Sequence, residues 1–383
     1  MAHARVCVLA YVYTVWTGAN GVKLNVSGSY PVKPMPLAAR EGLEGSQCYE
    51  EMKHGRPVLA YLRKWGGMSY TSLWERTFIR ELLRDAGDVV ICDIPGTAEH
   101  ILELLHRSGD SPVGFIVGGF PRHTLLTDLV SPLQRSEKKP RVLLHLSDEG
   151  GKYKPTYIYP RVMPPDGLVL RQYQFWPELP TAPRTRVVPL GYNAGLDLGG
   201  DSCAAARRNA GGGPHGRSYA WAFVGGMHAT PWGDRAAMVR ELLGPGRSFS
   251  EADQLDSGEA FVGQRSGPGM FEVYRRAVFA PNLPGARNNE CFRVYEATIA
   301  GAIPVIVGNE TEVQMAYGYH ADASWSHKRP PFVFAPTWAD ARTQMSSLRG
   351  DPRKLESLQA QLPEWYCSWV RGIQQELAQK LQK

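Results

Sequence analysis

Short, unbroken apolar runs alternate with amphipathic segments along most of the chain. In residues 56–195 the apolar runs are Val89–Ile94, Val113–Val117, Val142–Leu146, Leu168–Leu170 and Val187–Leu190. Between the first two runs, residues 97–108 predict a helix with Thr97 as its N-cap and Ile101, Leu104 and Leu105 on one face. Another helix is predicted over residues 72–87, before the first of these runs. Strands that are apolar on both faces and alternate with helices predict a parallel sheet flanked by helices.

The second half of the chain repeats this alternation. Its apolar runs are Tyr219–Val224, Ala277–Ala280, Ile303–Val307 and Phe332–Phe334, and helices are expected over 233–243, 269–276, 289–300 and 338–347. A last helical pattern covers residues 353–380, with an interruption near Pro363. The predicted fold class is therefore α/β, with two Rossmann-like domains facing a cleft.

Composition divides the chain further. Residues 196–218 are rich in glycine and have no apolar periodicity, which predicts a linker between an N-terminal domain (56–195) and a C-terminal domain (219–350). Residues 20–55 are rich in Gly and Pro and are expected to form an irregular stem, and residues 351–383 a C-terminal helix. Two domains also suit a length of 383 residues.

The N-terminus carries a targeting pattern. A basic start precedes an apolar run of 11 residues, Val6–Trp16, and small residues follow at 17–19. This predicts that residues 1–19 are a signal peptide or signal anchor, and hence a secretory protein of the Golgi lumen or membrane; the alternative is a buried first strand. Sequons at Asn25 and Asn309 matter only in that compartment. Cys92, inside the run VVICDI, is expected to be a core thiol.

Charge and motifs exclude several classes. The net charge of +6 is spread along the sequence without the basic patch of a nucleic-acid binder, although it suits an anionic ligand. The chain has neither GxxxxGK[ST] nor a GxGxxG after its first strand, which excludes a P-loop NTPase and disfavours a dinucleotide oxidoreductase.

Residues 279–307 form the most informative segment. They read as a strand, a turn at Pro284-Gly285, a helix ended by Gly301 and a second strand. Glu290, Arg293 and Glu296 recur at spacings of three, which places them on one side of that helix, near its electropositive N-terminus. An arginine there can grip a diphosphate while a carboxylate accepts from ribose hydroxyls. The alternative is a solvated face with ordinary ion pairs.

Two further patterns lie at strand ends. Gly225 and Gly226 follow the run Tyr219–Val224 and would let a ligand approach the backbone, with Arg235 at the next helix start placed for phosphate oxygens. A plain tight turn is the alternative.

In the first half, His145, Asp148 and Glu149 end a strand, where a catalytic base belongs. A helix N-cap and a core histidine are the alternatives. Arg171 is a candidate for binding an acidic acceptor, and Trp176 for stacking on a sugar. The alternative is that Trp176 and the aromatic residues beside it belong to the core.

Four segments of the chain resemble exostosin-type glycosyltransferases, and more closely the ribitol xylosyltransferases of dystroglycan glycosylation. These segments are residues 219–242, 288–306, 330–341 and 363–377. The resemblance is looser over residues 55–195. The resemblance implies a GT-B architecture and a terminal helix that packs back onto the first domain. It also implies a donor site for a UDP-sugar. The residues expected at that site are Gly225, Gly226, Arg235, Pro284, Gly285, Glu290, Arg293 and Glu296, with Arg293 on the phosphates and Glu296 on the ribose.

The implied reaction transfers a sugar, xylose by resemblance, to a glycan or polyol-phosphate acceptor with inversion. No cofactor is expected to be permanently bound. Because no DxD triplet ends a strand, donor binding is expected to be metal-independent. Nucleic acid is not an expected partner, and a membrane is one only through the N-terminus. Two alternatives are a non-catalytic nucleotide- or glycan-binding module and an exostosin-type transferase acting on matrix or wall polysaccharide.

Overall fold

The computed structural model describes most of the chain beyond the N-terminal segment. The described residues are 45–63, 70–118, 125–146, 155–172, 182–192, 196, 198–226, 234–245, 255–257, 259–263, 265, 267–283, 290–317 and 329–382. They belong to one compact unit, Leu43–Lys383. The predicted signal segment and residues 20–44 of the predicted stem lie outside the described residues. Among the helices described, none has both the length and the apolar character needed to cross a bilayer.

The first sheet has six parallel strands in the order β2-β1-β3-β4-β5-β6. In that order the strands are Val90–Pro95, Val58–Arg63, Val113–Val117, Val142–His145, Leu168–Arg171 and Arg184–Val187. Its helices are α1 (Gly45–Lys53), α2 (Tyr70–Leu82), α3 (Ala98–Arg107), α4 (Leu125–Arg135) and α5 (Pro155–Val162), with a 3₁₀ turn η2 (Arg84–Ala86). The central strands β3, β4 and β5 are buried along their whole length, which explains their unbroken apolar sequences.

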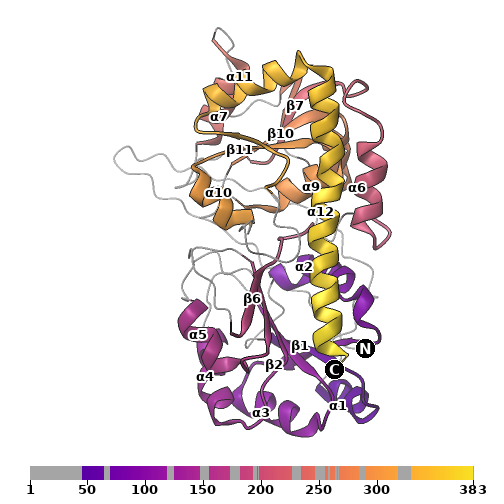
Figure 1. The fold of residues 1–383 in the computed structure, drawn as a ribbon, viewed down its shortest axis with the longest axis vertical. Helices are drawn as coiled ribbons and strands as arrows, with labels where there is room; N and C mark the ends of the chain where they lie inside the picture. The colour runs from indigo at the N-terminus through magenta and orange to yellow at the C-terminus, as the bar shows by residue number, and fades with distance from the viewer. Residues whose placement is uncertain are drawn as a thin grey trace, which may run out of the picture. The chain divides into compact units, whose positions relative to one another are not determined.

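The second sheet has the order β12-β11-β10-β7-β9-β8, and its strands are parallel except for the pair β8 and β9. In that order the strands are Val333–Ala335, Ile303–Val307, Ala277–Asn282, Tyr219–Val224, Ala260–Gly263 and Leu255–Asp256. Its helices are α7 (Arg235–Leu243), α8 (Pro268–Arg275), α9 (Phe292–Ile299), α10 (Glu310–Tyr317) and α11 (Trp338–Arg349). Two mainly parallel sheets with flanking helices confirm the predicted α/β fold class with two Rossmann-like units (Figure 1).

Helix α9 ends where glycine allows it to end. Gly301 adopts φ 78°, a left-handed conformation that glycine tolerates without strain. The Ala302 N–H donates to the Ala297 carbonyl at 2.9 Å, and the Gly301 N–H to the Thr298 carbonyl at 3.0 Å. This C-cap sends the chain directly into β11.

Three local expectations differ from the structure. Helix α1 occupies the end of the segment predicted to be an irregular stem, and Cys48 of α1 forms a disulfide with Cys92, which is therefore not a free core thiol. Helix α6 (Ser202–Ala210) lies inside the predicted linker 196–218. Its buried residues are Ser202, Cys203, Ala205 and Ala206, which are too small to stand out as an apolar stripe.

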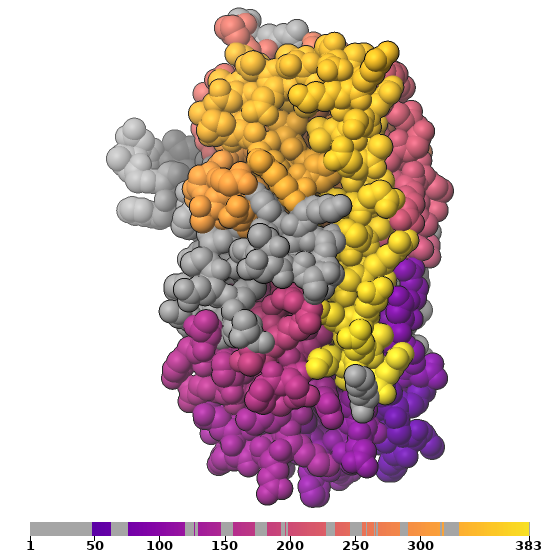
Figure 2. Space-filling model, viewed as in Figure 1, coloured from indigo at the N-terminus to yellow at the C-terminus, as the bar shows by residue number. Residues whose placement is uncertain are grey.

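Helix α12 (Pro352–Leu381) connects the two sheets. It continues through Pro363 without the predicted interruption, and Figure 2 shows its outer side exposed along one face of the molecule. The Gln359 amide donates at 2.6 Å to the carbonyl of Gly301, which lies between α9 and β11 of the second sheet. Further along, the Trp369 Nε1 donates to the Val187 carbonyl of β6 at 3.2 Å, and the Gln374 amide to the Glu81 carbonyl of α2 at 2.8 Å. The two sheets therefore share one hydrophobic core that runs through α12.

Candidate active site

The described candidate residues fall at the carboxyl ends of strands in both sheets. Gly225 and Gly226 follow β7, and Arg293 and Glu296 lie on α9, which follows β10. On the first sheet, His145 ends β4 and Arg171 ends β5. Asp148, Glu149, Trp176, Pro284 and Gly285 lie outside the described residues. Carboxyl ends are where open α/β sheets bind ligands, so the predicted residues are grouped at the chemically useful edges.

Two arginines approach one phenyl ring at the end of β7. The guanidinium carbon of Arg293 lies 5.6 Å from the centroid of the Phe223 ring, and that of Arg235 lies 6.0 Å from the same centroid. Arg235 also donates from Nη1 to the Gly226 carbonyl at 2.7 Å. A Cβ on Gly225 would lie 3.5 Å from Arg293 Nη1 and 3.1 Å from Phe223 Cζ, so glycine leaves room for both side chains.

The arginine pair combines like charges with buried guanidinium nitrogens. Burial lowers the pKa of Arg235, and the neighbouring charge of Arg293 lowers it further. The Nε atoms of both arginines are buried, and neither has a hydrogen-bond partner among the described residues. Buried guanidinium donors without acceptors are costly, and an anion seated between them would satisfy both charge and hydrogen bonding. Phosphate oxygens match that requirement.

Glu296 accompanies this pair from one turn further along α9. Its side chain is buried. The pKa of Arg293 is raised chiefly by the Cys291 sulfur, and further by Tyr274 and Glu296, while burial opposes the shift. Among the described side chains at this edge, one carboxylate and two guanidiniums give a net positive charge. The predicted role of Glu296 on a ribose stays a prediction.

Glu290 occupies a different place from the one expected. The extended Cys291 is the N-cap of α9, so Glu290 precedes the helix and does not share its face with Arg293 and Glu296. It is fully buried, and its Oε1 accepts hydrogen bonds from the Leu190 N–H at 3.1 Å and from the Tyr295 hydroxyl. Because Leu190 follows β6 of the first sheet, this carboxylate joins the two sheets.

The first sheet presents a buried cluster of three side chains. His145 Nδ1 lies 2.8 Å from the Tyr159 hydroxyl and 3.3 Å from Arg171 Nη1. Arg171 Nη1 also donates to the Tyr159 hydroxyl at 2.7 Å. Arg171 has no exposed surface, and its predicted role in binding an acceptor stays a prediction. His145 and Arg171, proposed from the sequence for different roles, are thus brought into contact.

Sequence reasoning missed Phe223 and Tyr159. Phe223 had a usable signal, because alternate residues of a strand share a face and Phe223 is two positions before Gly225. Tyr159 had none, since it comes from α5, a helix whose apolar pattern is interrupted by Pro160. Its role depends on packing that sequence spacing does not reveal.

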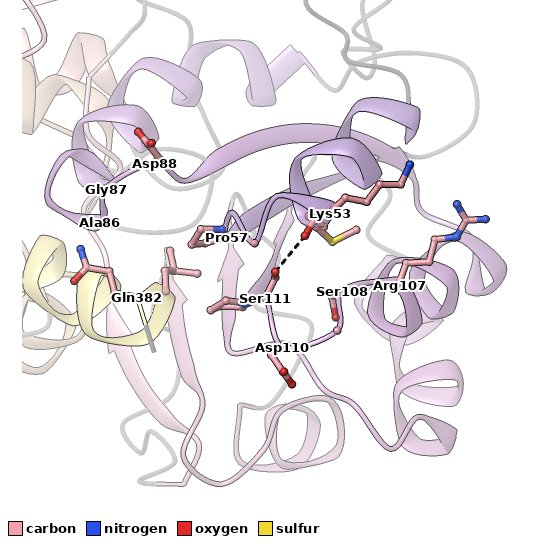
Figure 3. Close-up of a pocket in the computed structure, with 15 residues that line it drawn as sticks. Lys53, Pro57, Ala86, Gly87, Asp88, Arg107, Ser108, Asp110, Ser111 and Gln382 are labelled. Carbon is pink, nitrogen blue, oxygen red and sulfur yellow. Dashed lines mark hydrogen bonds between the residues drawn. The ribbon is translucent and has the colours of Figure 1, made fainter.

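A cavity of about 670 Å³ lies at the opposite edge of the first sheet (Figure 3). Pro57 and Pro112 line it just before β1 and β3 begin, so it lies at the amino ends of the strands. The residues that line it include the cations Lys53 and Arg107 and the carboxylates Asp88 and Asp110. Its mixed charge and its position separate it from both candidate edges.

A possible metal-ligand group lies near α2 and α6. Ligand atoms of Glu81, Asp201 and Cys203 lie within 4.8 Å of one another. Both Glu81 oxygens already accept hydrogen bonds, Oε2 from the Tyr192 hydroxyl at 2.9 Å and Oε1 from the Ser202 N–H and hydroxyl at 2.9 and 2.8 Å. The group is therefore explained as a structural hydrogen-bond network.

The likeness of the chain to solved structures is distant in both sequence and fold. Two solved structures match with low identity: HepE of Anabaena in complex with UDP and glucose (10% identity, TM-score 0.48, 85% of this chain and 100% of that chain) and a mutant O-GlcNAc transferase of Thermobaculum terrenum (12%, 0.42, 85% and 66%). No curated protein sequence matches. At these identities the roles of individual residues rest on the geometry of this chain alone.

The family comparison is specific to the C-terminal part. Residues 272–383 match the family model of the RXYLT1 C-terminal domain. That segment includes β10, α9, β11 and α12, and with them Glu290, Arg293 and Glu296. The match supports a glycosyltransferase, and it confirms over residues 272–383 the predicted resemblance to the ribitol xylosyltransferases.

Proposed function

We propose that this protein transfers a sugar from a UDP-sugar, with xylose as the sugar, to a glycan or polyol-phosphate acceptor. The observation that carries the proposal is the pair Arg235 and Arg293 beside Phe223, with buried Nε donors that lack partners among the described residues. A diphosphate supplies two adjacent anionic groups, which suits two guanidiniums at one strand end. Xylose, UDP and the acceptor class come from the predicted resemblance.

The arginines would act on the leaving group. As the bond between the anomeric carbon and the diphosphate oxygen breaks, negative charge grows on the departing UDP. Guanidiniums already held in place by Phe223 and the Gly226 carbonyl would stabilise that charge without reorganisation. This is the role that a divalent cation has in metal-dependent transferases, and metal independence remains part of the proposal.

Inversion requires one further group. The acceptor hydroxyl attacks the anomeric carbon from the face opposite UDP, a new carbon–oxygen bond forms, and a base takes the hydroxyl proton. Asp148 and Glu149 follow β4 in sequence and stay our candidates for this base. Glu296 would accept from the ribose hydroxyls.

The proposed compartment is the secretory pathway, and within it the Golgi. The Cys48–Cys92 disulfide, which ties α1 to β2, supports this, because disulfides persist in oxidising compartments. The N-terminal targeting pattern points the same way.

A donor screen tests the proposed function. Purified protein is incubated with UDP-xylose, UDP-glucuronate, UDP-galactose or GDP-fucose, and both melting temperature and nucleotide release are measured. We expect UDP-xylose to raise the melting temperature and to release UDP, because a ligand that binds only the folded state stabilises it. If a nucleotide sugar raises the melting temperature but no nucleotide is released with any acceptor that is added, a binding module is favoured. Folded protein that responds to no nucleotide sugar would contradict the proposal.

A further inference from the structure

The buried cluster at the carboxyl edge of the first sheet has a defined hydrogen-bond direction. His145 and Arg171 are direct partners in the parallel pairing of β4 and β5, and Tyr159 reaches them from α5. His145 is 2% exposed, and neither Arg171 nor Tyr159 has exposed surface. The Tyr159 and His145 rings meet edge to face with centroids 5.9 Å apart. Such packing holds each side chain in one orientation.

Each contact can be assigned a donor and an acceptor. An arginine has donors and no acceptor, so Tyr159 Oη accepts from Arg171 Nη1 at 2.7 Å. For the same reason, His145 Nδ1 accepts from Arg171 Nη1 at 3.3 Å. The Tyr159 hydroxyl proton then points to His145 Nδ1, 2.8 Å away. Two donors at Nδ1 leave the imidazole proton on Nε2.

We propose that Tyr159 is a positioning residue that holds His145 as the neutral Nε2–H tautomer. In this state Nε2 carries a hydrogen and Nδ1 faces two donors, so the ring has no lone pair available to accept a proton. His145 then serves as a hydrogen-bond donor at this edge, and the base of the transfer reaction is another residue. This last consequence rests on the proposed function, whereas the tautomer itself does not.

Nitrogen NMR tests the tautomer without any turnover. The full-length protein is labelled with ¹⁵N-histidine, and the His145 signals are assigned by their loss in His145→Gln. We expect a protonated Nε2 and an unprotonated Nδ1 in the wild type at neutral pH. Tyr159→Phe removes one of the two donors and should shift the His145 Nδ1 signal, while Arg171 remains. A wild-type ring protonated on Nδ1 would overturn the proposal.

Tyr157→Phe is the matched control. Tyr157 lies on the same helix, is 64% exposed, and its hydroxyl accepts from Arg161 Nη1 at 2.7 Å. Its loss should leave the His145 signals unchanged. If Tyr159→Phe also leaves them unchanged, Tyr159 is not a positioning residue.

Kinetics of His145→Gln test the consequence for catalysis. The glutamine amide nitrogen can replace Nε2–H as a donor but cannot act as a base. We expect UDP-xylose hydrolysis, with water as the acceptor, to stay within about tenfold of wild type and the acid limb of its pH profile to keep its position. Loss of a general base costs about 100- to 10,000-fold, so a loss of that size would show that His145 is the base. Absence of hydrolysis in the wild type would count against the proposed function, while the NMR result would still decide the tautomer.

Discussion

The carboxyl edges of the two sheets use arginine in opposite ways. On the first sheet, Arg171 is fully buried and donates to the neutral side chains of Tyr159 and His145. On the second sheet, Arg235 and Arg293 lie against the Phe223 ring, and burial together with the charge of Arg293 lowers the pKa of Arg235. The first arrangement satisfies the guanidinium from within, whereas the second leaves positive charge at the sheet edge. On the basis of this difference, our proposal assigns Arg171 to positioning and Arg235 and Arg293 to ligand binding.

The largest expected effect is on the first edge. Arg171→Ala should lower the free energy of unfolding by about 2–5 kcal/mol, because it opens a buried cavity and removes a donor from two buried groups. Urea denaturation measures this, with Arg240→Ala, an exposed arginine on α7, as the control expected to change little. If Arg171→Ala has the same free energy of unfolding as the wild type, the hydrogen bonds of Arg171 do not stabilise the first edge, and the contrast with the second edge is wrong.

The next effect is at the joint between the sheets. Glu290→Ala should cost about 2–4 kcal/mol, since the Leu190 N–H and the Tyr295 hydroxyl would lose their acceptor inside the protein. Glu290→Gln keeps one oxygen and should recover most of that loss in the same urea experiment. If nucleotide affinity falls in both variants while stability is unchanged, Glu290 is a donor-site residue as the sequence predicted, and its role as a joint is wrong.

A smaller effect should appear on the second edge alone. A Cβ at position 225 would lie 3.1 Å from Phe223 Cζ and displace the ring that both arginines approach. Gly225→Ala should therefore weaken UDP binding about 3–10-fold, roughly 1 kcal/mol, at nearly unchanged stability. Gly269→Ala is the control, because its nearest contact would be an ordinary 3.7 Å. Equal UDP affinity in both variants would argue against a ligand beside Phe223.

The smallest effect is a pH dependence away from both edges. Burial raises the pKa of Glu81 above its ordinary 4.5, although hydrogen bonds from Ser202 and Tyr192 oppose the shift. A raised carboxyl pKa means that the folded state binds the proton more tightly than the unfolded state. The resulting contribution of Glu81 to stability is full below pH 4.5 and is lost as pH rises through the folded pKa. Glu81→Gln should gain stability relative to wild type between pH 4 and 7. A difference that does not vary with pH would contradict this.

How far the sequence predicts this protein depends on the range of the interaction. The strands Tyr219–Val224 and Ile303–Val307 have their predicted bounds, because unbroken apolar runs between turn signals define buried strands locally. Arg235 at the start of α7 and Gly301 after α9 were likewise readable from local pattern. The sequence also predicted the α/β class and the resemblance that the family match confirms.

The remaining features depend on contacts between distant segments. Glu290 was predicted on a helical face because its spacing from Arg293 is helical, but an extended Cys291 separates it from α9 and directs it to Leu190, 100 residues earlier. The Cys48–Cys92 disulfide and the Tyr159 contact with His145 are equally non-local. Spacing within one segment carries no information about such partners.

The central claim is that Arg235 and Arg293 bind the diphosphate of a UDP-sugar. Isothermal titration of UDP into wild type, Arg293→Ala and Arg240→Ala tests it most directly. Charged hydrogen bonds contribute about 1.5–3 kcal/mol, so Arg293→Ala should bind UDP about 10–100-fold more weakly than wild type, while Arg240→Ala binds it equally well. Equal affinity of wild type and Arg293→Ala, or no binding of UDP to folded wild type, would contradict the claim.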